Sequence, residues 1–115
     1  MSRDRGLRLQ NALARYLSAW WPSAESAGSG RKGRDVLGTV GVWWENKTDA
    51  DGEHRPGAYM RQAAKGASMC DDLPVVVWWP PGVANPEKAI AQLPLANLMR
   101  LLELADVAPP RRETS

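Results

Sequence analysis

The chain has few of the residues that stabilise small proteins by covalent links or bind transition metals. It contains one cysteine, Cys70, and one histidine, His54, and it lacks phenylalanine. A single cysteine excludes a disulfide within the chain and is typical of a reducing compartment. No apolar run approaches the length of a membrane span, and the charged first residues are not followed by the apolar core of a signal peptide. We therefore expect a cytoplasmic protein that makes no membrane contact.

Charge is only weakly biased, with a net value of +2, and this alone does not indicate a nucleic-acid partner. Tryptophan is abundant instead, with six copies, of which four form the pairs 43–44 and 78–79. Without phenylalanine, these residues are expected to supply much of the aromatic core. The length of 115 residues and hydrophobic content of 43% suit one domain with one core. We assign that domain to residues 1–108 and expect residues 109–115 to be a disordered tail.

Apolar periodicity predicts helices at residues 4–20, at residues 58–69, and from Pro94 onward. Strands are expected at residues 35–37, 42–47 and 74–79, with an edge strand near 88–93; a short strand near 25–29 is an alternative to a loop. The run at 74–79 is unbroken and apolar, as in a strand buried at the centre of a sheet. The predicted fold is an α/β domain with a central mixed sheet of four to five strands flanked by helices, in the order α-β-β-β-α-β-β-α. The last helix has an apolar face made by Leu95, Leu98, Met99, Leu101, Leu102 and Leu104.

Three charged side chains are expected to meet at one edge of this sheet. Glu45 and Lys47 are two residues apart on a predicted strand, so they project to the same face while Asn46 points away. If the strand before the turn at Gly38–Gly41 pairs with this one, Asp35 joins them. Two carboxylates beside a lysine form a credible site for a divalent metal.

This pattern resembles the PD-(D/E)XK nuclease superfamily, and most nearly the small phage-type Holliday junction resolvases and virus-type replication-repair nucleases. The residues that carry the resemblance are Asp35, the glycine-flanked turn at 38–41, and Glu45-Asn46-Lys47. It implies a restriction-endonuclease-like fold and Mg²⁺-dependent hydrolysis of phosphodiester bonds in branched or structured DNA, with Mn²⁺ as a substitute. It also implies a homodimer, because a four-way junction presents two symmetric scissile phosphates. A role in phage recombination or repair follows from the same resemblance.

The chemistry assigns a role to each site residue. Asp35, Glu45 and the backbone carbonyl of Asn46 would bind the metal, and Lys47 would orient or deprotonate the attacking water. Gln62, on the second helix, falls where some relatives place another side chain of the site. Arg31, Lys32 and Arg34 form a basic cluster next to Asp35, and we expect them to bind DNA phosphates.

The chain departs from this pattern on its first helix. Relatives of the resolvase type carry a glutamate there that completes the metal site, and the matching residue here is Gln10, a poorer ligand for Mg²⁺. Either Glu25 compensates, or the site binds one metal rather than two. This departure motivates a second hypothesis, a nuclease-like protein that binds DNA without cutting it.

Ordinary structural roles also account for many of these residues. Asp35 suits a turn or a cap, Glu45 and Lys47 suit a solvated strand, and the basic cluster suits a solubilising loop. His54 in a polar loop and a buried or half-buried Cys70 need no catalytic role. Each tryptophan pair is expected to place one member on either face of its strand, and the inward member is expected to pack in the core rather than against nucleic-acid bases. The outward member is expected either beneath a helix or at a dimer contact. A third hypothesis, a small adaptor, rests on tryptophans that would be exposed.

Overall fold

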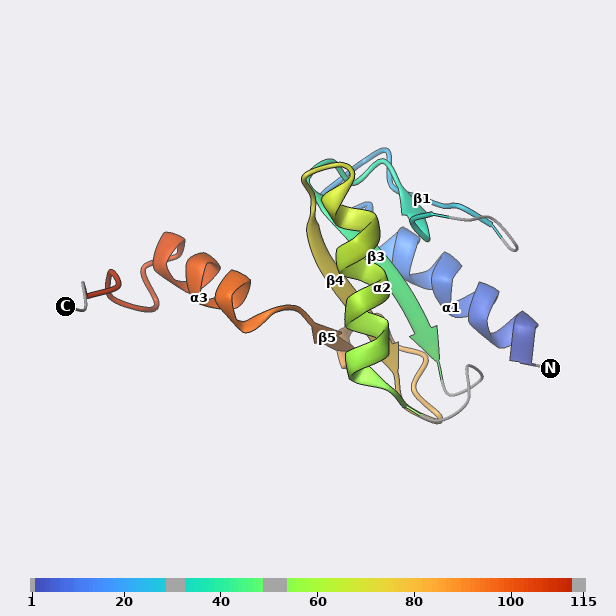
Figure 1. Cartoon of the computed structure of the whole chain (residues 1–115). Coiled ribbons are helices and arrows are strands. Elements are labelled where there is room, and N and C mark those ends of the chain that lie inside the picture. Colours follow the sequence, from blue (N-terminus) through green and yellow to red (C-terminus); the bar gives the residue numbers. More distant parts are fainter. Residues whose placement is uncertain (1, 29–32, 49–53, 113–115) are drawn as a thin grey trace.

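The apolar run that begins at Leu73 forms the central strand of a three-stranded sheet, as predicted. The computed structural model describes residues 2–28, 33–48 and 54–112. The domain is of the α/β class, with three helices and two sheets in the described chain (Figure 1). The elements in order are α1 (Ser2–Leu17), β1 (Glu25–Ser26), β2 (Val36–Leu37), β3 (Val42–Thr48), α2 (Pro56–Ser68), β4 (Leu73–Trp79), a 3-10 turn (Pro86–Lys88), β5 (Ile90–Gln92) and α3 (Leu95–Leu104).

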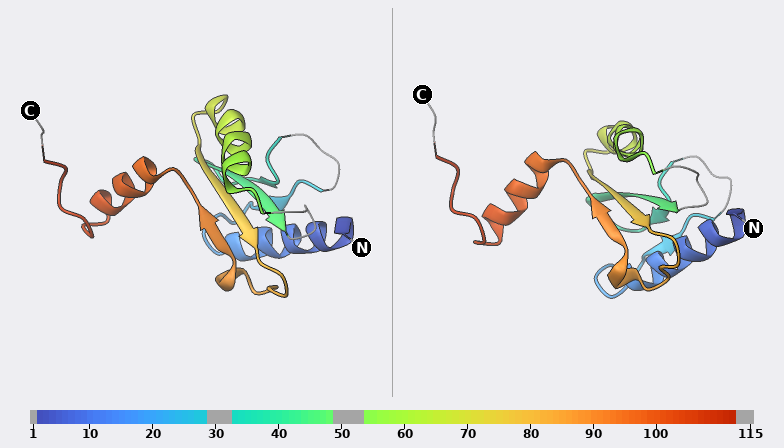
Figure 2. Two further views of the ribbon diagram at one scale, coloured as in Figure 1. Left: turned by 60° about the horizontal axis from the view of Figure 1, so that its bottom comes forward. Right: turned by 90° about the horizontal axis from the view of Figure 1, so that it is seen from below.

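The larger sheet has the strand order β3-β4-β5 and is mixed. β3 and β4 run parallel, with Glu45 opposite Val76, and α2 makes the crossover between them. β5 pairs antiparallel with β4, with Ile90 opposite Trp78. α2 covers one face of this sheet and α1 the other, so the body has three layers (Figure 2).

The expected single sheet of four to five strands is instead divided in two. β1 and β2 form a separate antiparallel pair, with Ser26 opposite Val36. Gly38 lies in the left-handed region at φ 81°, and a side chain there would collide with the carbonyl oxygen of Ser23. The tight turn that follows, closed by the Val42 amide bonding to the Thr39 carbonyl, redirects the chain. The β2 segment then contacts β3 through a backbone bond from Asp35 to Trp44 instead of a continuous ladder.

Because successive side chains of a strand point to opposite faces, the larger sheet has one hydrophobic core on each face. Trp43 and Trp78 face α2, where they pack with Tyr59, whereas Trp44 and Trp79 face α1. The predicted division of each tryptophan pair is therefore confirmed. Both faces of β3 and β4 are thus covered by helices, which leaves the ends and edges of these strands as the places where polar groups reach solvent.

α3 departs from this arrangement, because it points away from the layered body (Figures 1 and 2). The Cα radius of gyration is 14.9 Å, larger than the roughly 13 Å expected for a compact chain of this size. The last helix was predicted correctly in position and amphipathic pattern, yet its apolar face is not part of the core. Of the tail expected at 109–115, residues 113–115 lie outside the described chain. Among the described helices, none combines the length and apolar character needed to cross a membrane.

Candidate functional site

The chain brings its predicted acidic and basic residues together where β3 passes beneath α2. Glu45 and Lys47 both project from β3 towards α2, as the alternation of the strand requires. They line an open cavity of about 650 Å³ together with Asp35 and Gln62. The full lining is Gly33, Asp35, Trp43, Glu45, Asn46, Lys47, Gln62, Lys65, Gly66 and Met69.

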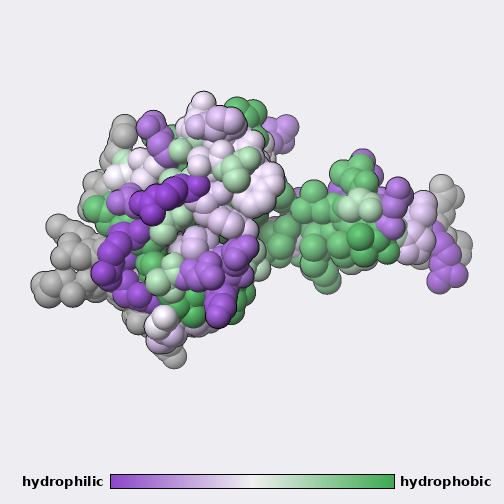
Figure 3. All heavy atoms as spheres, turned by 180° about the vertical axis from the view of Figure 1, so that it is seen from behind, coloured by the Kyte–Doolittle hydropathy of each residue, from purple (hydrophilic) through white to green (hydrophobic). Residues whose placement is uncertain are grey.

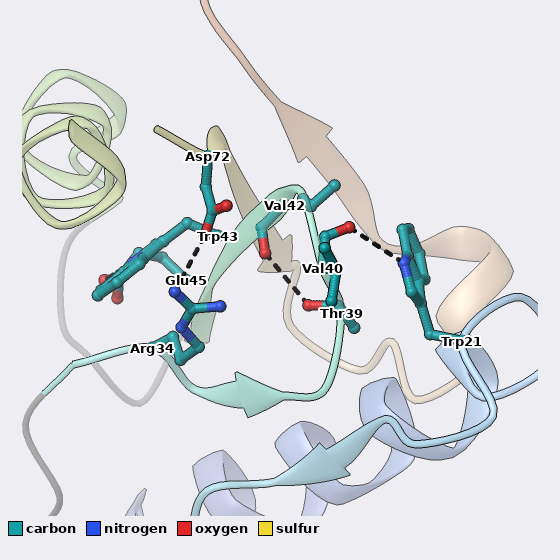
Figure 4. Close-up of polar contacts among 8 residues, drawn as sticks. All are labelled: Trp21, Arg34, Thr39, Val40, Val42, Trp43, Glu45 and Asp72. Carbon is teal, nitrogen blue, oxygen red and sulfur yellow. Dashed lines mark hydrogen bonds and ion pairs between the residues drawn. The ribbon is translucent and has the colours of Figure 1, made fainter. Parts of the chain in front are cut away.

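Glu45 is the most enclosed member of this group, only 3% exposed. The indole Nε1 of Trp43, which lies beside Glu45 in Figure 4, donates a hydrogen bond to its Oε1 at 3.0 Å. The Gln62 amide donates to its Oε2 at 3.4 Å. Burial raises the pKa of Glu45 above its ordinary value, although the bond from Trp43 acts in the opposite direction. The nearby Asp35 carboxyl raises this pKa further through its charge and a hydrogen bond, while the positive charge of Lys47 lowers it.

Asp35 is placed by the backbone of the strand that carries Glu45. Its Oδ2 accepts a 2.6 Å hydrogen bond from the amide of Asn46, and its own amide donates to the carbonyl of Trp44. In a strand, the amide and carbonyl of one residue point to the same side. The Asn46 carbonyl therefore points towards Asp35 and away from β4, as its predicted role as a ligand requires.

The side chain of Asn46 is used elsewhere. It projects to the opposite face of the sheet, where its Oδ1 accepts a 2.7 Å bond from the indole of Trp79 and its amide donates to Gly6 of α1. These bonds attach the end of β3 to α1 and hold the backbone that positions Asp35. Any contribution of Asn46 to the cavity is made by its main chain.

Two lysines bring positive charge to the cavity. The ammonium of Lys47 lies 5.3 Å from the centre of the Tyr59 ring, a cation–π contact that steadies a long side chain. Lys65 lines the same cavity from α2, one helical turn after Gln62. Lys65 was not predicted as a site residue, although its spacing of three residues from Gln62 indicates that both lie on one face of the helix.

Two further residues of the site were also missed. Trp43 was assigned to the core, yet its indole N–H binds Glu45; their spacing of two along β3 could have indicated this contact. Gly66 allows α2 to approach closely, because a Cβ atom there would lie 2.3 Å from Cζ2 of Trp43. The sequence offers no comparable signal for Gly66, since its importance depends on the packing of α2 against β3.

The expected basic cluster is represented in the described chain by Arg34, since Arg31 and Lys32 lie outside it. Arg34 forms a 2.9 Å ion pair with Asp72, and its guanidinium lies 4.8 Å from the centre of the Trp43 ring (Figure 4). The pair lacks the alignment of a hydrogen bond, since the Asp72 oxygen has no hydrogen-bond partner in the described chain. Arg34 thus holds Trp43 in place next to Glu45, and its charge is already engaged within the protein.

The two residues suggested as an additional metal ligand, Gln10 and Glu25, do not line this cavity. Gln10 is buried, and its amide donates to Ser26 at 2.9 Å and to the Gly28 carbonyl at 3.3 Å, so it ties α1 to β1. Glu25 is exposed and lies outside the cavity lining. Within the described residues, no three Asp, Glu, His or Cys side chains gather as a metal site.

Cys70 and His54 have no place in the cavity lining. The expectation of a buried or half-buried Cys70 is wrong: the thiol is exposed, because the residue follows the end of α2 where the chain turns towards β4. His54 stacks on Trp78 with 3.9 Å between ring centres. The tryptophan pairs, on which the adaptor hypothesis rested, lie within the two cores; Trp20 is the one tryptophan of the described chain that is largely exposed.

No family model, curated protein or solved structure matches this chain. The geometry of the cavity is therefore the basis for a functional argument.

Proposed function

We propose that the chain is a divalent-metal-dependent DNA endonuclease with a restriction-endonuclease-like fold. The observation that carries this proposal is the placement of Asp35, Glu45 and Lys47 in one open cavity, with the Asn46 carbonyl directed to the same side. The order of elements and the parallel pairing of β3 with β4 support the assignment of fold.

The acidic pair has the chemistry of a cation site. Asp35 and Glu45 lie close enough to raise the pKa of Glu45, so their negative charges repel when both are ionised. Lys47 opposes this only in part, and a bound divalent cation would offset it more fully. Hard cations such as Mg²⁺ accept carboxylate and carbonyl oxygens and keep several waters, which suits a site with two carboxylates and one main-chain carbonyl. Mn²⁺ prefers the same ligands.

The remaining residues have separate roles. When bound, the cation supplies Lewis-acid polarisation of a phosphate oxygen and of water. Lys47 lies beside the carboxylates, where its ammonium orients the attacking water and neutralises charge on the phosphate. Trp43 and Gln62 hold the two oxygens of Glu45 in fixed positions. Lys65 adds a second positive charge for an anionic substrate at the rim.

The substrate proposed is branched or structured DNA, cut by a homodimer. An open cavity beside an exposed helix face is accessible to a bulky phosphodiester backbone, and positive charge at its rim suits a polyanion. Arg31 and Lys32 remain proposed phosphate contacts, whereas Arg34 is proposed to act by fixing Trp43. Recombination or repair in a phage setting stays part of this proposal through the resemblance in sequence alone.

A second candidate is a protein of this fold that binds DNA without cutting it. Gln10 favours this alternative, because the residue that matches the metal-binding glutamate of resolvase relatives is a neutral amide here, and it is engaged in tying α1 to β1. Cleavage measured alongside binding separates the two functions.

The test uses the purified chain with a four-way junction, a flap and a linear duplex of the same sequence, in Mg²⁺, in Mn²⁺ or in excess chelator. We expect metal-dependent cleavage of the junction or flap in preference to the duplex. Asp35→Asn, Glu45→Gln and Lys47→Met should each lower the rate by at least about 100-fold, while DNA binding is retained.

The matched control is Glu87→Gln, which removes an exposed carboxylate outside the cavity lining and should leave the rate unchanged. Salt-sensitive binding without nicking in either metal would support the second candidate instead. Cleavage that survives both Asp35→Asn and Glu45→Gln would refute the assignment of the site.

A further inference from the structure

A second cavity adjoins the one that contains Asp35 and Glu45. Its volume is about 330 Å³, and it lies between the β1–β2 pair and the turn that follows α2. Gly33, Trp43 and Met69 line both cavities, so the two meet at these residues. The other lining residues of the described chain are Ala27, Arg34, Leu37 and Cys70.

The walls of this second cavity are held by bonds within the chain. On one side the Ala27 amide donates a 2.9 Å bond to the backbone just before β2, which extends the pairing of β1 with β2. On the other side the Cys70 amide donates a 3.0 Å bond back to the last turn of α2. The 2.9 Å ion pair between Arg34 and Asp72 joins the two sides (Figure 4). The separate β1–β2 sheet thus forms one wall of a cavity fixed by the fold.

The lining of the second cavity is mostly apolar. Trp43 and Ala27 are buried, Leu37 is half-buried, and the described lining contains no carboxylate. Its one charged side chain is Arg34, whose guanidinium lies 4.8 Å from the centre of the Trp43 ring. A guanidinium carries five N–H donors in one plane, so it can keep its ion pair and still stack on, or donate to, a flat ring. Apolar walls beside a guanidinium suit an aromatic ring with polar edges.

Met69 lines this cavity although it is 77% exposed. Figure 3 shows many of the exposed apolar residues gathered over α3, which projects from the body. Met69 instead belongs to the body, at the end of α2, and borders both cavities. A thioether is polarizable and makes favourable contacts with aromatic rings. An exposed methionine at this place is suited to a ring that enters from solvent.

We infer that the second cavity binds an unpaired nucleobase of the DNA substrate, on a nucleotide that flanks the phosphate to be cut. This inference rests on the proposed function, because a phosphodiester held at Asp35 and Glu45 brings a neighbouring base next to Met69. The apolar faces and polar edges of a base match the apolar walls and the Arg34 guanidinium. The volume is at the small end of the roughly 300–1,000 Å³ of ligand pockets, so the cavity suits one base and excludes a stacked base pair.

The base subsite makes an unpaired base a determinant of substrate choice. A base inside a duplex must be unpaired and unstacked before it can enter, and this costs least for a base that is already single-stranded. Flaps and bulges present such bases, whereas a fully paired four-way junction does not. The chain should therefore cut a flap or a bulge in preference to a fully paired junction.

The test compares an intact flap with a flap whose unpaired nucleotides next to the branch point are abasic. Dissociation constants are measured with the full chain in Ca²⁺ and in excess chelator, and KM and kcat are measured in Mg²⁺. Removal of the bases should raise the dissociation constant and KM at least about 10-fold, as expected for the loss of one stacked base. The value of kcat should change little, because the base contact is made equally before and during cleavage.

A variant that fills the second cavity tests where the base binds. Cys70→Trp adds an indole from an exposed turn, and circular dichroism checks that the fold is kept. It should weaken binding of the intact flap at least about 10-fold and leave the abasic flap unaffected, since that flap has no base to exclude. Met69→Ala removes a contact without adding bulk and should give a smaller loss, again confined to the intact flap. The matched control is Ala64→Trp, at an exposed position of α2 outside both linings, and it should change neither.

The outcomes separate the base subsite from the nuclease activity. Equal dissociation constants for the intact and abasic flaps, or equal losses for both flaps in Cys70→Trp, would overturn the base subsite. Base-dependent binding without cleavage in Mg²⁺ or Mn²⁺ would support the base subsite and refute the nuclease activity. A chain that binds neither flap would overturn both proposals.

Discussion

α2 packs closely on Trp43 because Gly66 has no side chain. Both the stability of the fold and the position of Glu45, which accepts a hydrogen bond from Trp43, depend on this packing. In Gly66→Ala the new Cβ would lie 2.3 Å from Cζ2 and 2.5 Å from Cε2 of Trp43. The indole is 5% exposed and cannot swing aside freely. Overpacking of this kind costs about 1–3 kcal/mol, and the better helix propensity of alanine returns up to about 1 kcal/mol. We expect a net loss of about 1–2 kcal/mol, which lowers the melting temperature by about 4–10 °C.

Gly6→Ala is the matched control for this change. Gly6 also lies inside a helix, but a Cβ there meets no atom of the described chain within 4 Å. The same substitution should therefore stabilise the protein by about 0.5–1 kcal/mol. Urea titrations followed by far-UV circular dichroism give both free energies of unfolding. If Gly66→Ala is as stable as wild type, α2 and β3 do not pack as closely as described and the argument is refuted. Under the proposed function, Gly66→Ala should also weaken metal binding, because displacement of Trp43 breaks its bond to Glu45.

Three further predictions concern the charged groups of the site. Mg²⁺ at about 100 times its dissociation constant should raise the free energy of unfolding by about 2.7 kcal/mol, and Asp35→Asn should remove this effect in thermal melts. Without metal, the raised pKa of Glu45 means that the folded state binds this proton more tightly than the unfolded chain. Stability from this group is therefore present below the ordinary pKa of 4.5 and is lost as pH rises through the folded pKa, so Glu45→Gln should gain stability relative to wild type as pH increases. Arg34→Ala should cost about 1–2 kcal/mol, since it leaves Asp72 unpaired and removes the cation from Trp43.

Two of these have a control within the chain. Glu87→Gln should leave the response to Mg²⁺ intact, because Glu87 is exposed and lies outside the cavity lining. A double-mutant cycle of Arg34→Ala and Asp72→Ala should give a coupling energy above about 0.5 kcal/mol. Additive effects in that cycle would show that the ion pair contributes nothing, and parallel pH profiles for wild type and Glu45→Gln would contradict the raised pKa.

The strand pattern was the most reliable guide to both fold and site. An unbroken apolar run identified β4 as the central strand, and simple alternation placed Glu45 and Lys47 on one face and the Asn46 side chain on the other. The same rule divided each tryptophan pair between the two cores. These features depend on neighbours close in sequence, and a periodicity of two is sufficient to predict them.

Features that depend on distant partners were beyond the sequence. The ion pair of Arg34 could not be predicted, because its partner Asp72 lies on a separate segment, after α2. Gln10 was considered as a weak ligand, and only the fold shows its amide bonding to Ser26. The apolar period of α3 correctly predicted a helix with one apolar face, but periodicity cannot tell whether that face is covered by the same chain. The two sheets are separated at the turn that begins at Gly38. The pattern of apolar residues predicts the strands on either side of this turn, but it does not predict the direction in which the turn sends the chain.

The division of the tryptophans between two faces gives the protein a built-in optical reporter. Trp43 is bonded directly to Glu45, whereas Trp44 and Trp79 lie on the far side of the sheet. A paramagnetic Mn²⁺ ion held by Asp35 and Glu45 would quench the emission of Trp43 far more strongly than that of the two indoles facing α1. Intrinsic fluorescence would then follow occupancy of the site without any added label, and Trp43→Phe would identify the part of the signal that comes from it.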